Sequence, residues 1–141
     1  MIAQLDSRIR AAPSYVRFAL VGIVATVVDF TLFNVGLAGE YDPDTYHLLT
    51  AATAGFTVAT YVSYQLNARF TFRATRDNTA LGRYFAIAVM GVLIHNGALL
   101  ALRAAASPDN FIALNLTKAG ALSISMLWNY VGYRQFAFKR S

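Results

Sequence analysis

The sequence predicts an all-α membrane protein whose four transmembrane helices form two helical hairpins. Two observations predict this fold class: four long apolar stretches, and a repeat that relates the two halves of the chain. Of the 141 residues, 57% are hydrophobic and only 13% are charged, whereas a soluble domain carries about 25% charged residues. A chain with this composition is typical of a small polytopic membrane protein. Its length predicts a single domain over 1–141.

Each of the four apolar stretches is long enough to cross a bilayer, because about 20 helical residues span a hydrocarbon core of roughly 30 Å. The stretches cover 17–39, 47–66, 84–102 and 111–133. Beyond Arg17, the first stretch has one charged residue, Asp29. It is too long for the apolar core of a signal peptide, so we expect it to stay in the mature protein.

The residues before the first stretch predict a short helix at the membrane interface. Ile2, Leu5 and Ile9 follow a helical spacing beside two arginines, and Pro13 ends the pattern. A frayed N-terminal tail is the alternative interpretation of 1–12.

The distribution of charge predicts the orientation of the helices. The loop 40–45 is acidic, whereas ten of the 12 Lys and Arg residues lie in the N-terminal segment, the second loop or the C-terminal tail. The positive-inside rule places these basic segments in the cytoplasm, so we expect both termini inside. Basic residues at helix ends fit anionic lipid headgroups better than nucleic acid, and the net charge of +5 does not predict nucleic-acid binding.

A shift of 66 residues relates the two halves, approximately 15–73 and 83–139. It pairs Arg17-Phe18 with Arg83-Tyr84, Tyr64 with Tyr130, and Phe70-x-Phe72-Arg73 with Phe136-x-Phe138-Lys139. Because each half begins and ends on the same side, the repeats are parallel. The endings 69–73 and 135–139 alternate phenylalanine with polar residues, which predicts short extended segments at the cytoplasmic interface.

Three ionisable residues are expected at one depth in the outer half of the membrane. Asp29 lies about 15 Å from the outer end of its helix, and His95 and Lys118 lie about 10 Å from theirs. Two interpretations stay open: a buried Asp–Lys pair that only determines packing, or a polar site for a substrate or proton. For His95, a hydrogen-bonded structural role is an equal alternative.

Polar residues also follow helical faces. The second stretch carries Thr50, Thr53, Thr57, Thr60, Tyr64 and Asn67, and the fourth carries Asn115, Lys118, Ser125 and Asn129. The first carries Gly22, Ala25, Asp29 and Gly36, and the third Ala88, Gly91, His95 and Ala98. Small residues favour close helix packing, whereas the long polar faces indicate either packing or a path for a hydrophilic group.

Several motifs are missing from the sequence. There is no cysteine and no glycine-rich phosphate loop, so a thiolate metal site is excluded and ATP hydrolysis is not expected. His47 and His95 are too few and too far apart in depth for a metal cluster. No nucleophile stands with a base and an orienting group. We therefore expect neither an enzyme nor a cofactor.

Four segments together resemble the GtrA family over 17–138: RFALVGIVATVVDFTLFN, VSYQLNARFTF, LTKAGAL and SMLWNYVGYRQFAF. The resemblance implies a four-helix protein that moves polyprenyl-phosphate-linked sugars across the cytoplasmic (inner) membrane of a prokaryote for surface polysaccharide synthesis. A related module is the membrane portion of some polyprenyl-phosphate mannose synthases. Matched residue by residue, the acidic and basic family positions are Asp29 and Lys118. The helix-end motif is Asn67, Arg69, Phe70 and Phe72 in the first half and Asn129, Arg134 and Phe138 in the second, where Tyr133 replaces the usual Asn.

The resemblance implies a flippase. Four arginines near the inner surface are expected to attract the phosphate: Arg17, Arg69, Arg83 and Arg134. The sugar is expected to hydrogen-bond to the polar residues of the core, namely Thr57, Thr60, Tyr64, Asn67 and Asn129. Lys118 is expected to receive the phosphate further out if Asp29 releases it. Without an ATP site, transport would run downhill.

Two other functions remain as alternatives. One is a non-transporting scaffold that anchors a glycosyltransferase. The other is a proton-coupled exporter of cations, which Lys118 disfavours because its charge repels cations. The expected partners are a polyprenyl-phosphate-linked sugar, membrane lipids, a glycosyltransferase and further copies of the chain, since four helices hardly enclose a sugar path.

Overall fold

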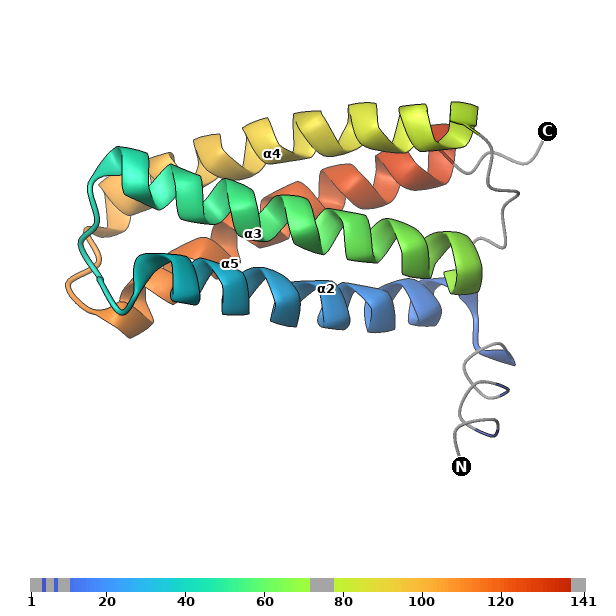
Figure 1. The fold of residues 1–141 in the computed structure, drawn as a ribbon, viewed down its shortest axis with the longest axis horizontal. Helices are drawn as coiled ribbons and strands as arrows, with labels where there is room; N and C mark the ends of the chain where they lie inside the picture. Colours follow the sequence, from blue (N-terminus) through green and yellow to red (C-terminus); the bar gives the residue numbers. More distant parts are fainter. Residues whose placement is uncertain (1–3, 5–6, 8–10, 72–77, 138–141) are drawn as a thin grey trace.

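Four α-helices run side by side along the long axis of the protein (Figure 1). The computed structural model describes Gln4, Ser7, 11–71 and 78–137. The helices are α2 (Ser14–Leu37), α3 (Thr45–Leu66), α4 (Asn78–Ala106) and α5 (Phe111–Gly132). Within these residues the predicted all-α fold is confirmed. The N-terminal helix predicted over 1–12 lies mostly outside the described residues, of which Gln4, Ser7 and Ala11 are helical.

The helices pair as two hairpins, α2 with α3 and α4 with α5, as predicted. The helices of one hairpin pack much more closely against each other than the two hairpins do. In the first hairpin the chain leaves α2 through Ala38 and Gly39, which have φ of 50° and 85°. Asp44 then caps α3 by accepting a hydrogen bond from the backbone N–H of His47, and Asn110 caps α5 in the same way through Ala113.

Both hairpins end in a π-helix, η1 (Asn67–Thr71) and η2 (Tyr133–Ala137), at positions related by the repeat. The prediction of extended endings over 69–73 and 135–139 is therefore wrong for 69–71 and 135–137, and the remaining positions lie outside the described residues. A wide helical turn keeps the backbone hydrogen bonds inside the segment, which an extended ending at the membrane boundary would not do. The alternation of phenylalanine with polar residues is compatible with either conformation.

The repeat also appears in the contacts between the hairpins. The rings of Tyr64 and Tyr84 meet edge to face, with centroids 4.6 Å apart and an interplanar angle of 65°. Phe18 and Tyr130, the equivalent pair, meet with centroids 4.9 Å apart at 66°. One geometry of contact thus joins α3 to α4 and α2 to α5 near the ends of the helices.

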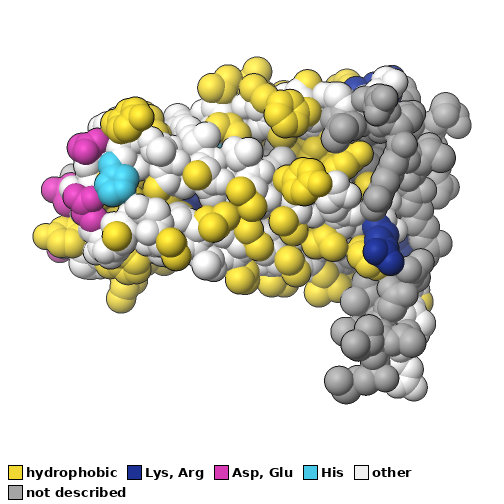
Figure 2. Space-filling view, in the orientation of Figure 1, with side chains coloured by type: hydrophobic (Ala, Val, Ile, Leu, Met, Phe, Trp, Pro, Cys, Tyr) yellow, Lys and Arg dark blue, Asp and Glu magenta, His cyan; other side chains and the backbone are white. Residues whose placement is uncertain are grey.

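Among the described residues, three helical segments are long and apolar enough to span a membrane: Ser14–Leu37, Gly82–Ala106 and Phe111–Phe136. Helix α3 is as long as α5 at 22 residues, but its threonines and tyrosines lower its hydropathy. Its close packing against α2 places it beside a candidate span. On the face in Figure 2, acidic side chains gather at one end of the bundle and basic ones at the other.

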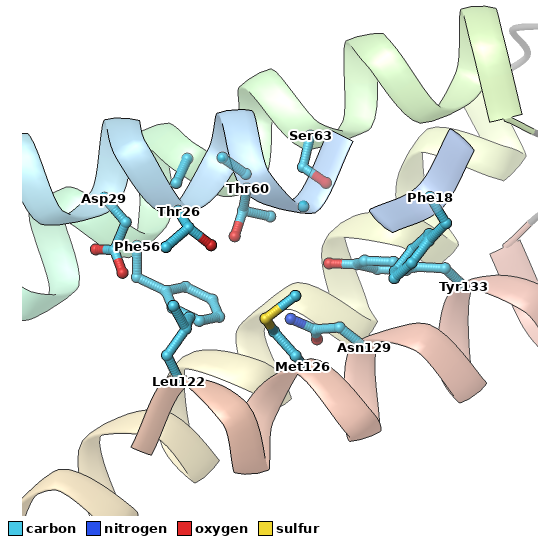
Figure 3. A pocket seen from close by; sticks show the side chains of 13 residues that line it. Phe18, Thr26, Asp29, Phe56, Thr60, Ser63, Leu122, Met126, Asn129 and Tyr133 are labelled. Carbon is cyan, nitrogen blue, oxygen red and sulfur yellow. The ribbon is translucent and has the colours of Figure 1, made fainter. Parts of the chain in front are cut away.

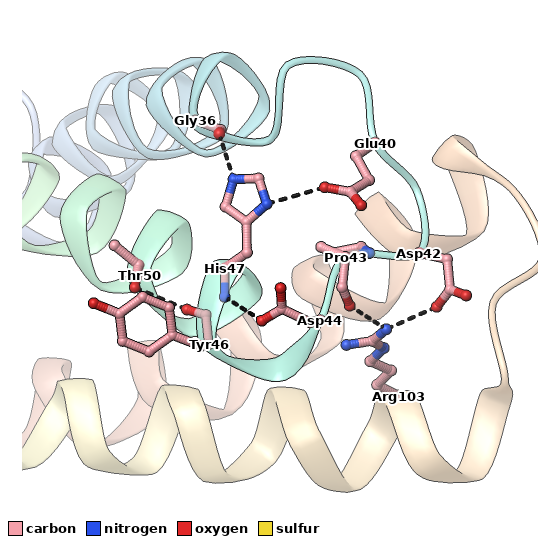
Figure 4. A network of polar contacts seen from close by, with 9 residues as sticks. All are labelled: Gly36, Glu40, Asp42, Pro43, Asp44, Tyr46, His47, Thr50 and Arg103. Atoms are coloured by element: carbon pink, nitrogen blue, oxygen red, sulfur yellow. Dashed lines mark hydrogen bonds and ion pairs between the residues drawn. The ribbon is translucent and has the colours of Figure 1, made fainter.

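A polar network closes the acidic end of the first hairpin (Figure 4). The His47 ring lies 2.9 Å from both the Gly36 carbonyl oxygen and Oε2 of Glu40. Both partners only accept hydrogen bonds, so the ring bonds to both only when it is doubly protonated. His47 lies in the first turn of α3, outside the candidate spans, and its pKa is raised by the bond to Gly36 and then by Glu40.

The second hairpin is tied to the same loop. Nη2 of Arg103, on α4, donates to Oδ1 of Asp42 at 2.8 Å and to the Pro43 carbonyl at 2.6 Å. This contact joins the two hairpins at the end where the two helix–helix loops lie.

Candidate functional site

A buried cluster of ionisable side chains lies between the hairpins. Nζ of Lys118, on α5, is 2.7 Å from Oδ2 of Asp29, on α2, and the two side chains are 0% and 1% exposed. Nε2 of His95, on α4, lies 3.5 Å from the same ammonium. Because an ammonium only donates, this contact is a hydrogen bond only when Nε2 carries no proton. The structure thus brings together the three residues that the sequence places at one depth.

The ammonium of Lys118 also lies near two aromatic rings. It is 4.7 Å from the ring centre of Phe33 and 5.1 Å from that of Phe30, distances at which a cation is attracted to a ring face. Because the Lys118 side chain is 0% exposed, a phosphate cannot reach the ammonium in this conformation. The predicted contact between Lys118 and a phosphate therefore requires that the ion pair opens.

Helix α3 approaches Asp29 closely at a glycine. A Cβ at Gly55 would lie 2.7 Å from both the backbone oxygen and Oδ1 of Asp29, so only glycine fits here without a shift of α2. Among the described residues Oδ1 has no hydrogen-bond partner. Gly91 allows a similar approach of Asn129, whose Oδ1 would lie 2.5 Å from an added Cβ.

A cavity of about 60 Å³ adjoins the ion pair between α2, α3 and α5; most of its lining is apolar, but several polar groups reach it, and we call it the polar cavity. The threonine and serine hydroxyls and the Asp29 carboxylate lie on α2 and α3, and the amide of Asn129 lies on α5 beside Leu122 and Met126 (Figure 3). The residues around it are Phe18, Gly22, Ala25, Thr26, Asp29, Phe56, Ala59, Thr60, Ser63, Leu122, Met126, Asn129 and Tyr133. At roughly 15 Å³ per water, it has room for about four water molecules.

Three of the predicted site residues line this cavity: Asp29, Thr60 and Asn129. Sequence reasoning missed others, notably Thr26, Ser63 and Tyr133. Two signals were available for them. Thr26 lies one helical turn before Asp29, and the repeat makes Ser63 and Tyr133 equivalent to Asn129 and Asn67.

The remaining residues of the predicted α3 stripe do not line the cavity. Thr57 is exposed on the side of α3 that faces α4. Tyr64 and Asn67 are buried near the basic end, where Nδ2 of Asn67 donates to Ser63 Oγ at 3.0 Å. Tyr84 donates its hydroxyl to the same oxygen at 3.3 Å. The contacts of Tyr84 with Ser63 and Tyr64 therefore join the two hairpins.

Two amide contacts between hairpins were also missed by the sequence reasoning. Asn34 and Asn115 exchange hydrogen bonds of 3.0 and 3.1 Å between α2 and α5. Asn96, on α4, donates to Thr53 Oγ1, on α3, at 2.8 Å. Part of the predicted polar faces therefore serves helix association.

The four predicted arginines lie at the end of the bundle opposite the acidic loops. Arg69, Arg83 and Arg134 are exposed there, and Arg17 is half-buried. Arg134 donates to the Tyr130 hydroxyl at 3.3 Å. The structure thus gathers these residues at one end, apart from the Asp29–Lys118 pair.

Within 11–71 and 78–137, no group of three or more His, Asp or Glu side chains is arranged to hold a metal ion. Two apolar helical hairpins around a buried ion pair and a polar cavity define a multi-pass membrane module. Over residues 17–138 the chain matches the family model of the GtrA/DPMS transmembrane domain, and it belongs to this family. The family is generally linked to the handling of polyprenyl-phosphate sugars and is generally non-catalytic. Comparisons with curated proteins and with solved structures gave no match.

Proposed function

We propose that the protein flips a polyprenyl-phosphate-linked sugar across the cytoplasmic membrane, with both termini in the cytoplasm. The observation that carries the proposal is the buried Asp29–Lys118 pair beside a cavity that hydroxyl and amide groups reach. Charged residues inside a membrane are costly, and they are found most often on substrate pathways. Family membership supports the choice of substrate.

The charge distribution supports a route that begins at the basic end. Arg69, Arg83 and Arg134 are exposed around the inner ends of the helices, where they attract the anionic phosphate. The hydroxyls of Thr26, Thr60 and Ser63 then offer hydrogen bonds to a sugar that leaves water. This matters because an unsatisfied hydroxyl in hydrocarbon costs several kcal/mol, roughly 4–8 by water-to-cyclohexane transfer.

A sugar does not fit in a cavity with room for about four waters, so transport requires that the hairpins separate. The packing supports such a motion, since the two hairpins contact each other less closely than the helices within each one. Opening would part Asp29 from Lys118, which lie on different hairpins. The released ammonium then becomes available to the phosphate.

Vesicles test this proposal directly. The purified protein is reconstituted with a fluorescent polyprenyl-phosphate sugar, and the fraction of label that a membrane-impermeant quencher reaches is followed over time. We expect Thr26→Val and Ser63→Ala to slow flipping, each by up to about tenfold, because each removes a hydrogen bond worth roughly 1 kcal/mol.

Thr31→Val is the matched control on the same helix as Thr26. Thr31 is exposed, and its hydroxyl bonds to the Val27 carbonyl of its own helix at 2.7 Å. We expect this variant to flip at the rate of the unsubstituted protein. If the protein moves no labelled lipid, or if Thr26→Val and Thr31→Val have the same effect, the proposal is wrong.

The small size of the cavity favours a second candidate, a scaffold that holds a glycosyltransferase at the membrane. A scaffold needs the surface of the bundle and not its interior. It would therefore sustain sugar transfer in cells when Thr26 and Ser63 are replaced, while the vesicles show no flipping. Under either function we expect a homo-oligomer, because four helices enclose little space.

A further inference from the structure

A second hollow lies between α3 and α4. It has a volume of about 380 Å³, within the usual range for small-molecule pockets. Tyr64, Tyr84 and Ala88 form its buried floor, while Tyr61 and Phe85 are more than 60% exposed along its sides. Val58, Val89 and Val92 add aliphatic surface, so the groove is almost entirely apolar.

The repeat relates this groove to the polar cavity. The 66-residue shift pairs Phe18 with Tyr84, Gly22 with Ala88, and Thr26 with Val92, and the first of each pair lines the cavity while the second lines the groove. Equivalent junctions between the hairpins thus differ in chemistry. One carries the groups that suit a sugar, and the other carries those that suit hydrocarbon.

Two features connect the groove to the lipid-linked sugar that we propose for the polar cavity. Thr60 lines both hollows. At the basic end, the exposed Arg83 directly precedes Tyr84 of the groove floor. From Tyr84 the groove follows α4 to Val92, about 12 Å along the helix axis.

We propose that the groove between α3 and α4 binds the isoprenoid chain of the lipid-linked sugar. This inference rests on the proposed function and identifies the part of the molecule that holds the chain. The chain lies along the aromatic rings with its phosphate near Arg83, and the sugar enters beyond Thr60. A phospholipid has no sugar to place there, so the arrangement favours the isoprenoid.

Photo-crosslinking of the full chain in nanodiscs tests the inference. The probe is a polyprenyl-phosphate-linked sugar that carries a diazirine in its chain, and mass spectrometry locates the label. We expect label on Tyr61, Phe85 and Val89. We also expect excess unlabelled polyprenyl-phosphate-linked sugar to displace it, whereas excess phosphatidylglycerol does not.

Two variants at equivalent positions sharpen the test. Val89→Trp fills the groove from its half-exposed wall and should reduce labelling about tenfold. Ile23→Trp makes the same change at the equivalent exposed position on α2, which lines neither hollow, and should leave labelling unchanged. Phe85→Ala removes an aromatic ring from the side of the groove and should also weaken labelling. The test therefore does not depend on whether the Val89→Trp variant folds correctly.

Equal displacement by phosphatidylglycerol would overturn the inference, because the groove would then be an ordinary lipid contact. Label concentrated around Ile23 would overturn it as well. The vesicle assay keeps the two proposals separate. Flipping without label in the groove refutes only the chain site, whereas label in the groove without flipping supports the chain site and refutes transport.

Discussion

Breaking the buried ion pair should destabilise the protein more when one partner is changed than when both are. The structure gives the reason, because Asp29 and Lys118 are almost completely buried and 2.7 Å apart. Removing one partner of such a pair leaves a charge without compensation, which typically costs about 3–5 kcal/mol. Replacing both partners with neutral groups removes that penalty.

The two single changes should not be equal. Lys118→Met leaves a carboxylate whose Oδ1 already has no partner among the described residues, so we expect a loss of about 3–5 kcal/mol. In Asp29→Asn the ammonium stays buried without a counter-charge, but the amide oxygen still accepts a hydrogen bond from it, so we expect the lower end of that range, about 3 kcal/mol. The double variant buries one amide and no charge, at about 2 kcal/mol. The double loss should therefore be smaller than either single loss and fall about 4–6 kcal/mol below their sum.

Equilibrium unfolding of the purified protein in mixed micelles, followed by circular dichroism, measures the four free energies of this cycle. Ser123→Ala is the control, because Ser123 is exposed on the same helix as Lys118 and bonds only to its own backbone at Ala119. Combined with Asp29→Asn it should give additive losses. Additive losses for Asp29→Asn and Lys118→Met would refute the reasoning, since they would mean that the two side chains do not compensate each other.

Three further predictions concern other parts of the bundle. A cysteine at Asp42 should react with an impermeant thiol reagent added outside cells, and one at Thr79 should not; the reverse pattern would invert the proposed orientation. Because the pKa of His47 is raised on folding, its stabilising effect should be full below the ordinary histidine pKa of about 6.5 and be lost as the pH rises through the raised value. His47→Gln should remove this pH dependence from unfolding curves, and an unchanged curve would exclude the ring as its source. Gly55→Ala should cost about 1–3 kcal/mol because its Cβ meets α2, whereas Gly97→Ala, with nothing within 4 Å of the added atom, should be neutral or slightly stabilising in the same measurement.

Two of the four helices could be predicted closely from the sequence, whereas α4 (Asn78–Ala106) extends beyond the predicted stretch 84–102 at both ends. The apolar stretches 47–66 and 111–133 match α3 (Thr45–Leu66) and α5 (Phe111–Gly132) to within two residues. In a bilayer the length of an apolar run determines the span, since backbone groups in lipid must bond within the helix. The Asp29–Lys118 pair could be predicted for a related reason, because counting residues from the helix ends gives the depth of each charge.

The distribution of the polar groups could not be predicted in the same way. The three–four spacing places Thr53, Thr57 and Thr60 on one broad face, but it does not say which edge of that face meets another helix. Thr53 bonds to Asn96, Thr60 lines the cavity, and Thr57 is exposed. Contacts of this kind depend on how the two hairpins pack against each other. The spacing of residues within one helix does not predict that packing.

The ion pair has a consequence for how the two halves recognise each other. The repeat makes Asp29 equivalent to His95 and Lys118 equivalent to Ala52, so the negative charge belongs to one half and the positive charge to the other. Two copies of the first half would bring two carboxylates and two alanines to their junction, and two copies of the second would bring two ammonium groups and two histidines. Only unlike halves neutralise the buried charge. The Asp29–Lys118 pair therefore favours packing of the first hairpin against the second over packing of either hairpin against a copy of itself, although both hairpins share one architecture.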